Sequence, residues 1–336
     1  MYVVWLTGPK GLSPLAVALM MGAGDVALLA LELPTGAFAD RVGARASLVL
    51  GSLFQVLGMS LLWLATSAPG LALSVLSIAV GDAFRHGADE ALLYRSCAAL
   101  GLADRFAERV ARAQAATLFA LVALTAGGGW LVERAGFDAA FAVEIALSAA
   151  GLALAFALVD PAATPSAAAD ASGGDSPWTA LRARLPWPRI VPTSLVLALA
   201  SAGQFVLQSE SHGRVSARTL GLLIAAAQLL EAGGAALVAR GLVPAEARTL
   251  HWIAGATLAT VGLAALWPPA LAPALLLVFA GAGIAPAIRS ALLQRDAPDH
   301  ARATIASAAG ALDLLITAAT LSASALLLAV ARRSAP

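Results

Sequence analysis

The chain has 336 residues, of which 60% are apolar and 12% are charged, with a formal net charge of +1 and a mean hydropathy of +0.84. Soluble domains carry about 25% charged residues, so the composition excludes a soluble globular protein. The near-neutral charge leaves no basic face for nucleic acid, and the single cysteine, Cys97, excludes a disulfide within the chain.

Ten apolar stretches along the chain are long enough to cross about 30 Å of hydrocarbon as helices. They are residues 14–38, 46–66, 70–96, 106–132, 137–159, 188–210, 217–240, 249–267, 270–293 and 303–331. The apolar start, MYVVWLTGP, is too short to cross a bilayer and lacks the basic region and cleavage site of a signal peptide. The sequence therefore predicts an all-α, multi-pass membrane protein.

The longest break between apolar stretches is residues 160–187. It is rich in Pro, Ala, Ser and Asp, a composition that cannot bury itself and is typical of surface linkers. We therefore expect an N-terminal helical bundle over residues 1–159, a linker over residues 160–187 and a C-terminal helical bundle over residues 188–336.

The two halves resemble each other at an offset of about 200 residues. Gly81–Arg95 (GDAFRHGADEALLYR) and Gly281–Arg295 (GAGIAPAIRSALLQR) share the leading glycine and the ALL-x-R ending. The spacing from Glu32 to Arg41 likewise recurs from Glu231 to Arg240. Parallel repeats of this kind are typical of transporters, in which the substrate path lies between the repeats.

The same offset makes a prediction about the two ends. The span at residues 188–210 lacks a full partner before residue 10, and the span at residues 137–159 would have its partner beyond residue 336. We therefore expect a twelve-helix design without most of helix 1 and all of helix 12, so the first full span corresponds to helix 2.

The basic residues predict an orientation in the membrane. When the loop that holds Arg41 and Arg45 is placed inside, that side carries fourteen basic residues and the other side carries six. Cytoplasmic loops of membrane proteins are enriched in Lys and Arg. The linker over residues 160–187 is then cytoplasmic, and the expected location is a bacterial inner membrane.

The segment Gly36–Arg45, GAFADRVGAR, resembles the G-x-L-x-D-R-x-G-R-[KR] signature of the major facilitator superfamily. The matching residues are Gly36, Asp40, Arg41, Gly43 and Arg45. Ala44 stands where the family usually has Arg. The ELPTG lead-in, the ALLYRS end of helix 4 and the P-x-x-x-R-A-T-x-x-S run also look like bacterial members. The alternative is a charged tight turn that only anchors two helices.

This resemblance implies two six-helix bundles, a central cavity and alternating access, with no cofactor and no metal. It also implies that Asp40 contacts the N-terminal end of helix 11 and helps to hold one access state. Two departures stand out. Ala239 replaces the Asp in the second copy of the motif, and helix 5 reads ALTAGGGW without the Gly-Pro element of antiporters. The second departure argues against a proton-exchange exporter without excluding it.

Charged residues inside membrane spans are costly and mark functional sites by default. Asp82, Arg85 and Asp89 have the spacing i, i+3, i+7 and share one face if the helix is continuous. Arg85 can then pair with either carboxylate. These residues are candidates for a substrate or proton pathway, and the alternative is a structural ion-pair cluster.

Helix 2 carries Asp25 and Glu32, which are seven residues apart and also share a face. Asp25 is the deeper residue and the better candidate for carrying a proton. A structural role is favoured for Glu32, because Glu231 repeats it in the second half.

Three further polar residues are candidates for the substrate pathway. Gln204 and Gln208 have the spacing i, i+4 and could bind a substrate or bridge two helices. Asp313, like Glu144, is expected to be isolated.

These features predict a secondary active transporter that moves a small organic molecule by alternating access. Efflux of hydrophobic compounds, coupled to protons, is the leading form by analogy, and uptake of a metabolite is the second. The chain contains no phosphate-binding loop that would couple ATP to transport.

The alternative from another class is a truncated, non-transporting membrane protein, which is inert or serves as a receptor or assembly partner. No catalytic motif favours an enzyme.

Overall fold

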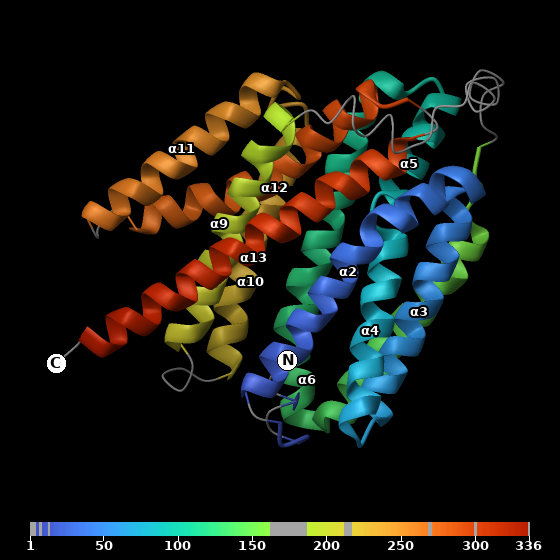
Figure 1. Cartoon of the computed structure of the whole chain (residues 1–336). Coiled ribbons are helices and arrows are strands. Elements are labelled where there is room, and N and C mark those ends of the chain that lie inside the picture. The colour runs from blue at the N-terminus through green and yellow to red at the C-terminus, as the bar shows by residue number, and fades with distance from the viewer. Residues whose placement is uncertain are drawn as a thin grey trace. The chain divides into compact units, whose positions relative to one another are not determined.

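The computed structural model describes residues 5–6, 9–12, 14–161, 187–211, 217–267, 271–298 and 301–334. Within these residues every regular element is a helix (Figure 1). In chain order the helices are α2 (Pro14–Val42), α3 (Ala44–Leu64), α4 (Ala68–Arg85), α5 (Ala88–Ala99), the short 3₁₀ helix η1 (Ala103–Arg105), α6 (Phe106–Ala157), α9 (Trp187–Ser211), α10 (Ala217–Ala239), α11 (Ala247–Leu266), α12 (Leu271–Asp296) and α13 (Arg302–Ser334).

Six helical segments of this described part are long and apolar enough to cross a membrane. They are Ala44–Leu64, Ala68–Ala99, Ala103–Ala157, Leu222–Ala239, Ala274–Asp296 and Arg302–Thr320. Helices satisfy their own backbone hydrogen bonds, which is what hydrocarbon requires of a spanning segment. The all-helical architecture is confirmed, whereas the expected ten full spans stay a prediction.

Two glycines separate helices. The span expected at residues 70–96 is interrupted at Gly87, whose φ is +74°, so α4 and α5 are separate helices. The element α6 consists of two helices that meet at Gly136, where φ is +79°, in agreement with the boundary expected between residues 132 and 137. Glycine tolerates this region of backbone space because it has no Cβ.

The helices form two compact units. The first consists of Met1–Ala103, Gly128–Leu185 and Ala297–Ala311, and the second consists of Asp104–Gly127, Pro186–Asp296 and Leu312–Pro336. The two long helices α6 and α13 are thus each divided between the units. The linker expected over residues 160–187 lies almost wholly outside the described residues, so the predicted domain boundaries stay a prediction.

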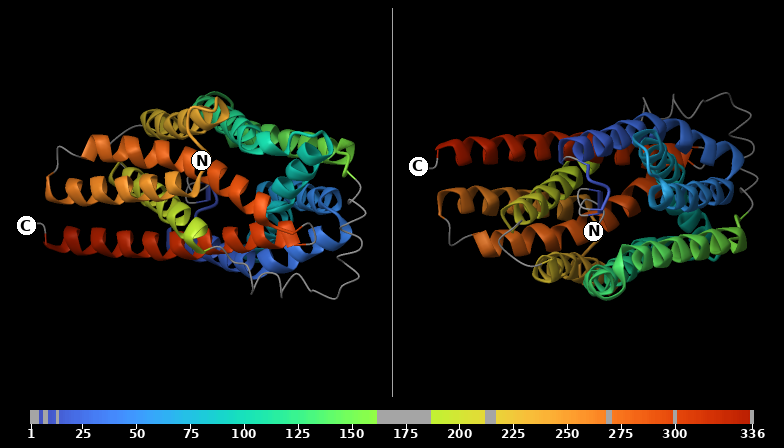
Figure 2. Two further views of the ribbon diagram at one scale, coloured as in Figure 1. Left: turned by 90° about the horizontal axis from the view of Figure 1, so that it is seen from above. Right: turned by 90° about the horizontal axis from the view of Figure 1, so that it is seen from below.

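In the first unit, α2 and α3 both pack on α4 (Figures 1 and 2). Helices α3 and α4 approach closely, because a Cβ on Gly51 would lie only 2.8 Å from the carbonyl oxygen of Gly81. Small residues allow such close packing in membrane helices. Trp5 and Leu6 are buried in a cluster with Leu62 of α3.

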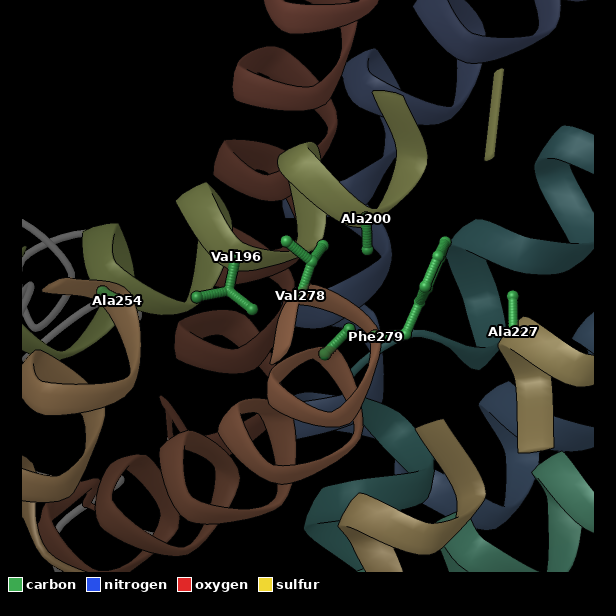
Figure 3. Packing of buried hydrophobic residues seen from close by; sticks show 7 residues of the cluster. Val196, Ala200, Ala227, Ala254, Val278 and Phe279 are labelled. Carbon is green, nitrogen blue, oxygen red and sulfur yellow. The ribbon is translucent and has the colours of Figure 1, made fainter. Parts of the chain in front are cut away.

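In the second unit, α10 and α11 both pack on α12, and α9 packs on α11 and α12. Figure 3 shows the core that these four helices form. Its labelled side chains are Val196 and Ala200 from α9, Ala227 from α10, Ala254 from α11, and Val278 and Phe279 from α12. The arrangement of α10 and α11 on α12 repeats that of α2 and α3 on α4, in agreement with the offset of about 200 residues.

We expect the variant Gly283→Ala to be destabilised. A Cβ at this position of α12 would overlap the carbonyl oxygen of Glu231 in α10, so the two helices would have to separate. Overpacking of this kind costs about 1–3 kcal/mol, which a lower Tm of the purified protein would report. Gly262→Ala is the matched control, because a Cβ there meets no atom within 4 Å. An equal fall in Tm for both variants would contradict this explanation.

Candidate functional site

The Gly36–Arg45 segment is mostly helical. Helix α2 continues to Val42, and only Gly43, with φ +119°, separates it from α3. The loop expected between these helices is therefore reduced to a single residue. Asp40 and Arg41 consequently lie in the last turn of α2, and Arg41 is exposed.

The Asp40 carboxylate binds the first turn of α13. Its Oδ1 accepts a hydrogen bond from the backbone N–H of Ala303 at 3.0 Å. Its Oδ2 accepts from the backbone N–H of Thr304 at 2.9 Å and from the Thr304 hydroxyl at 2.7 Å. The first N–H groups of a helix lack partners within the helix, and the helix dipole favours a negative charge there. The contact is the one that the family resemblance implies.

Close packing and burial act on this contact in opposite directions. Gly36 lies one turn before Asp40 and touches α13 so closely that a Cβ would lie 2.8 Å from the Ser307 hydroxyl oxygen. Burial raises the pKa of the Asp40 carboxyl above its usual range, against the opposing effects of the hydrogen bonds from Thr304 and Ala303 and the charge of Arg95.

Arg45 and Arg95 meet the end of α6 through Asp160. The Arg45 side chain donates to the carbonyl oxygen of Phe156 at 2.6 Å, and its backbone N–H donates to Asp160 Oδ2 at 3.3 Å. The Arg95 Nε lies 3.9 Å from Asp160 Oδ1. The basic end of the segment is therefore attached to the residues that precede the expected linker.

The polar set of helix 4 does not occupy one continuous face. Asp82 and Arg85 lie in α4 and approach to 3.7 Å, whereas Asp89 lies in α5, beyond the break at Gly87. Asp89 Oδ1 accepts the backbone N–H of Glu90 at 2.8 Å. The expectation of a single i, i+3, i+7 face is wrong, because Gly87 ends the helical register between Arg85 and Asp89.

Glu32 is completely buried and has a partner that its spacing did not reveal. Its Oε1 lies 2.5 Å from Nδ1 of His86, the residue that caps α4. One turn further along α2, the Thr35 hydroxyl donates to the carbonyl oxygen of Ala83 at 2.7 Å. These contacts tie α2 to the end of α4.

Asp25 lies in a different place, at a cavity of about 290 Å³ within the first unit. Asp82 shares this cavity, which is otherwise lined mainly by apolar residues. The lining includes Met21, Leu28, Met59 and Ile78. An adjoining apolar cavity of about 470 Å³ shares Gly24 and Val75 with it. Carboxylates at an apolar wall attract a positively charged group.

Asp313 was expected to be isolated, and this expectation is wrong. In the second unit, Arg289 Nη1 lies 2.8 Å from Asp313 Oδ1 and 2.6 Å from Oδ2. The buried Ser194 hydroxyl donates to Oδ1 at 2.5 Å. This cluster joins α9, α12 and α13. It fits a structural ion pair, because both charges are satisfied within the protein.

Gln204 is half-buried in α9, and the side chain of Gln208 lies outside the described part of the chain. Their expected role toward a substrate stays a prediction. No group of three or more His, Cys, Asp or Glu in the described ranges is placed to hold a metal ion.

Sequence reasoning missed His86, Arg289, Ser194 and Thr304. A signal existed for Arg289, because it is the only charge between residues 271 and 294. A lone charge in an apolar span requires a buried partner, and Asp313 is the only acidic residue in the next span. For Ser194 and Thr304 no such signal existed, since hydroxyls are common in membrane helices.

Comparison with known proteins gives a consistent result. The family model of the Major Facilitator Superfamily matches residues 1–320. The crystal structure of the human organic anion transporter MFSD10 (TETRAN) is similar with a TM-score of 0.64 and 20% identity, over 95% of this chain and 81% of that chain. The structure of the proton:xylose symporter XylE bound to 6-bromo-6-deoxy-D-glucose is similar with a TM-score of 0.63 and 15% identity, over 95% of this chain and 82% of that chain. No curated protein sequence matches the chain.

We expect Asp40→Asn to reduce transport at unchanged abundance in the membrane. The substitution removes the negative charge at the N-terminus of α13, an interaction of about 0.3–1 kcal/mol, and leaves an amide where three donors converge. Flux into vesicles, normalised to the amount of protein, measures the effect. Asp104→Asn, at an exposed acidic residue of η1, is the matched control. Flux equal to that of the unmodified chain would refute the role of Asp40.

We also expect Arg289→Met to lower the Tm, because it leaves the half-buried Asp313 carboxylate without its counter-charge. Breaking a fully buried ion pair on one side costs about 3–5 kcal/mol, which is the upper bound for this pair. The double variant Arg289→Met/Asp313→Leu removes both charges and is expected to be more stable than the single variant. If the loss of stability in the double variant equals the sum of the losses in the two single variants, the two residues are not coupled.

Proposed function

The chain belongs to the Major Facilitator Superfamily, and from this premise we propose that it is a secondary active transporter that moves a small organic molecule by alternating access. The observation that carries the proposal is the set of three hydrogen bonds from the first turn of α13 to Asp40. Such a contact holds one access state and must be released in the other.

The strength of this contact suits a switch. A carboxylate at a helix N-terminus contributes about 0.3–1 kcal/mol, and up to about 2 kcal/mol when it is partly buried. Two states that interconvert during transport differ by only a few kcal/mol. The Asp40 contact therefore biases the equilibrium between access states without making either one permanent. Gly36 supports the proposal, because it allows α2 to reach α13.

The cavity in the first unit supports a preference for an apolar substrate that is neutral or positively charged. Its lining includes Met21, Leu28 and Met59, and its charged residues are Asp25 and Asp82. An anionic substrate would be repelled by these carboxylates. MFSD10 is described as an organic anion transporter and XylE as a xylose symporter. We propose a different substrate class here, with efflux as the direction and a proton as the coupling ion.

The chain is a multi-pass membrane protein. The excess of basic residues on one side supports a bacterial inner membrane with the linker at residues 160–187 on the cytoplasmic side. We further propose ten full spans arranged as two helical bundles, which the repeated packing on α4 and α12 supports.

The competing interpretation, a truncated and non-transporting protein, is not favoured by the comparisons. The family and both structural neighbours are transporters, which also indicates a transporter rather than an enzyme.

Flux in liposomes tests the proposal. We expect an imposed pH gradient to drive movement of ethidium, an aromatic cation, and to drive xylose and the organic anion p-aminohippurate far less. Liposomes without protein are the control. Faster movement of p-aminohippurate than of ethidium would contradict the substrate class. If none of the three probes moves under a pH gradient or a membrane potential, the result would favour the non-transporting alternative.

A further inference from the structure

The carboxylate of Glu32 is buried, and only one of its two oxygens has a hydrogen-bond partner among the described residues. The side chain has an exposure of 0%, and Oε1 is the atom that lies 2.5 Å from His86 Nδ1. Within the described part of the chain, Oε2 has no hydrogen-bond partner. An ionised carboxylate with an unsatisfied oxygen is expensive to bury. With one proton on the imidazole the pair has a net charge of zero, and burying a neutral pair costs less than burying a net negative one.

The charges on α4 and α5 strengthen this requirement. Burial of the ring opposes a positive charge on His86, whereas the carboxylates of Glu32, Asp82 and Asp89 favour it electrostatically. Arg85 of α4 forms an ion pair with Asp82 at 3.7 Å. Three negative groups around one imidazole attract a positive charge on the ring.

In the described residues of α3 and α13, the charged side chains are engaged elsewhere. Helix α3 reaches the end of α4 through Ser47, whose hydroxyl donates to the carbonyl oxygen of Phe84 at 2.6 Å. Its charged residue, Arg45, is bound to Phe156. On α13, Arg302 stacks on the ring of Tyr94 at 4.0 Å, and Asp313 is paired with Arg289.

Both members of the pair also touch the segment of α13 that Asp40 binds. The Ser307 hydroxyl donates to the carbonyl oxygen of His86 at 3.2 Å. Gly87 lies against α13, where a Cβ would be 2.7 Å from the carbonyl oxygen of Ala303. Gly310 lies beside Glu32, where a Cβ would be 3.4 Å from Oε1. Residues 303–310 of α13 therefore lie against the buried Glu32 carboxylate and the backbone of His86, whose side chain is 47% exposed.

We propose that Glu32 and His86 form the binding site of the coupling proton, and that the bound proton holds the first turns of α13 against α2 and α4. This inference rests on the proposed transport function and identifies its coupling residues. Uptake of one proton from water converts a carboxylate and a neutral imidazole into a carboxylate and an imidazolium. Loss of that proton leaves a net negative charge under α13. Water must then reach Oε2, and the α13 segment separates.

Amide hydrogen exchange of the full chain in lipid nanodiscs tests this proposal without any substrate. We expect peptides from residues 301–311 to be better protected at about pH 6 than at about pH 8.5, the range in which histidine titrates, after correction for the intrinsic exchange rate. A tenfold difference in proton affinity between the two forms changes their population ratio by about tenfold, and the protection factor with it.

Two variants and two controls make the test specific. Glu32→Gln keeps the shape of the side chain and removes its charge, so protection of residues 301–311 becomes independent of pH. His86→Gln is also expected to make the protection of residues 301–311 independent of pH. It replaces Glu32→Gln in the test if that variant does not fold. Glu246→Gln, at an exposed carboxylate, retains the pH dependence of the unmodified chain. Asp25→Asn also retains it, although Asp25 is the other candidate for carrying a proton.

Three results would overturn the proposal. They are equal protection of the unmodified chain at both pH values, persistence of the pH dependence in Glu32→Gln and His86→Gln, and its loss in Asp25→Asn. Since the exchange measurement requires no flux, a failure of transport in liposomes would contradict the proposed function and the coupling role, whereas the pH-dependent contact of α13 with α2 and α4 would stand.

Discussion

The structure depends on one constraint, which is that a charge inside an apolar helical protein must be satisfied by the protein itself. Hydrocarbon offers neither hydrogen bonds nor counter-ions. Three pairings meet this constraint. Asp40 is satisfied by the N-terminus of α13, Glu32 in part by His86, and Asp313 by Arg289 and Ser194. Each pairing joins different helices, so these few polar contacts help to determine which helices can meet.

The same constraint explains why the candidate site lies where helices start and stop. A helix end leaves backbone N–H or C=O groups without partners. The first N–H groups of α13 are used by Asp40, and the carbonyl of His86 at the end of α4 is used by Ser307. Contacts made to helix ends can be broken without unfolding the helices. This property is what alternating access requires, because the same surfaces must separate and close in each cycle.

The Asp40 contact could be predicted from the sequence only because Gly36–Arg45 resembles a family motif. The partner of Asp40 in α13 lies 264 residues away, so no local spacing specifies it. The face proposed for Asp82, Arg85 and Asp89 was wrong, because helical spacing assumes an unbroken helix and Gly87 breaks it. The partners of Glu32 and Asp313 lie on other helices, and no periodicity within one helix specifies which residue of another helix lies opposite.

The two halves share a helical plan but differ in their charges, and the difference assigns them separate tasks. At the offset of 200, Pro286 stands in the place of His86, and Ala239 stands near the place of Asp40. Glu231, the counterpart of Glu32, therefore has no imidazole at the corresponding position. What α12 carries instead is Arg289, held by Asp313 in a satisfied ion pair. A satisfied pair gains nothing from a proton, whereas Glu32 retains an unpaired oxygen. The proposed proton site, Glu32 with His86, therefore has no direct counterpart among the corresponding residues of the second half.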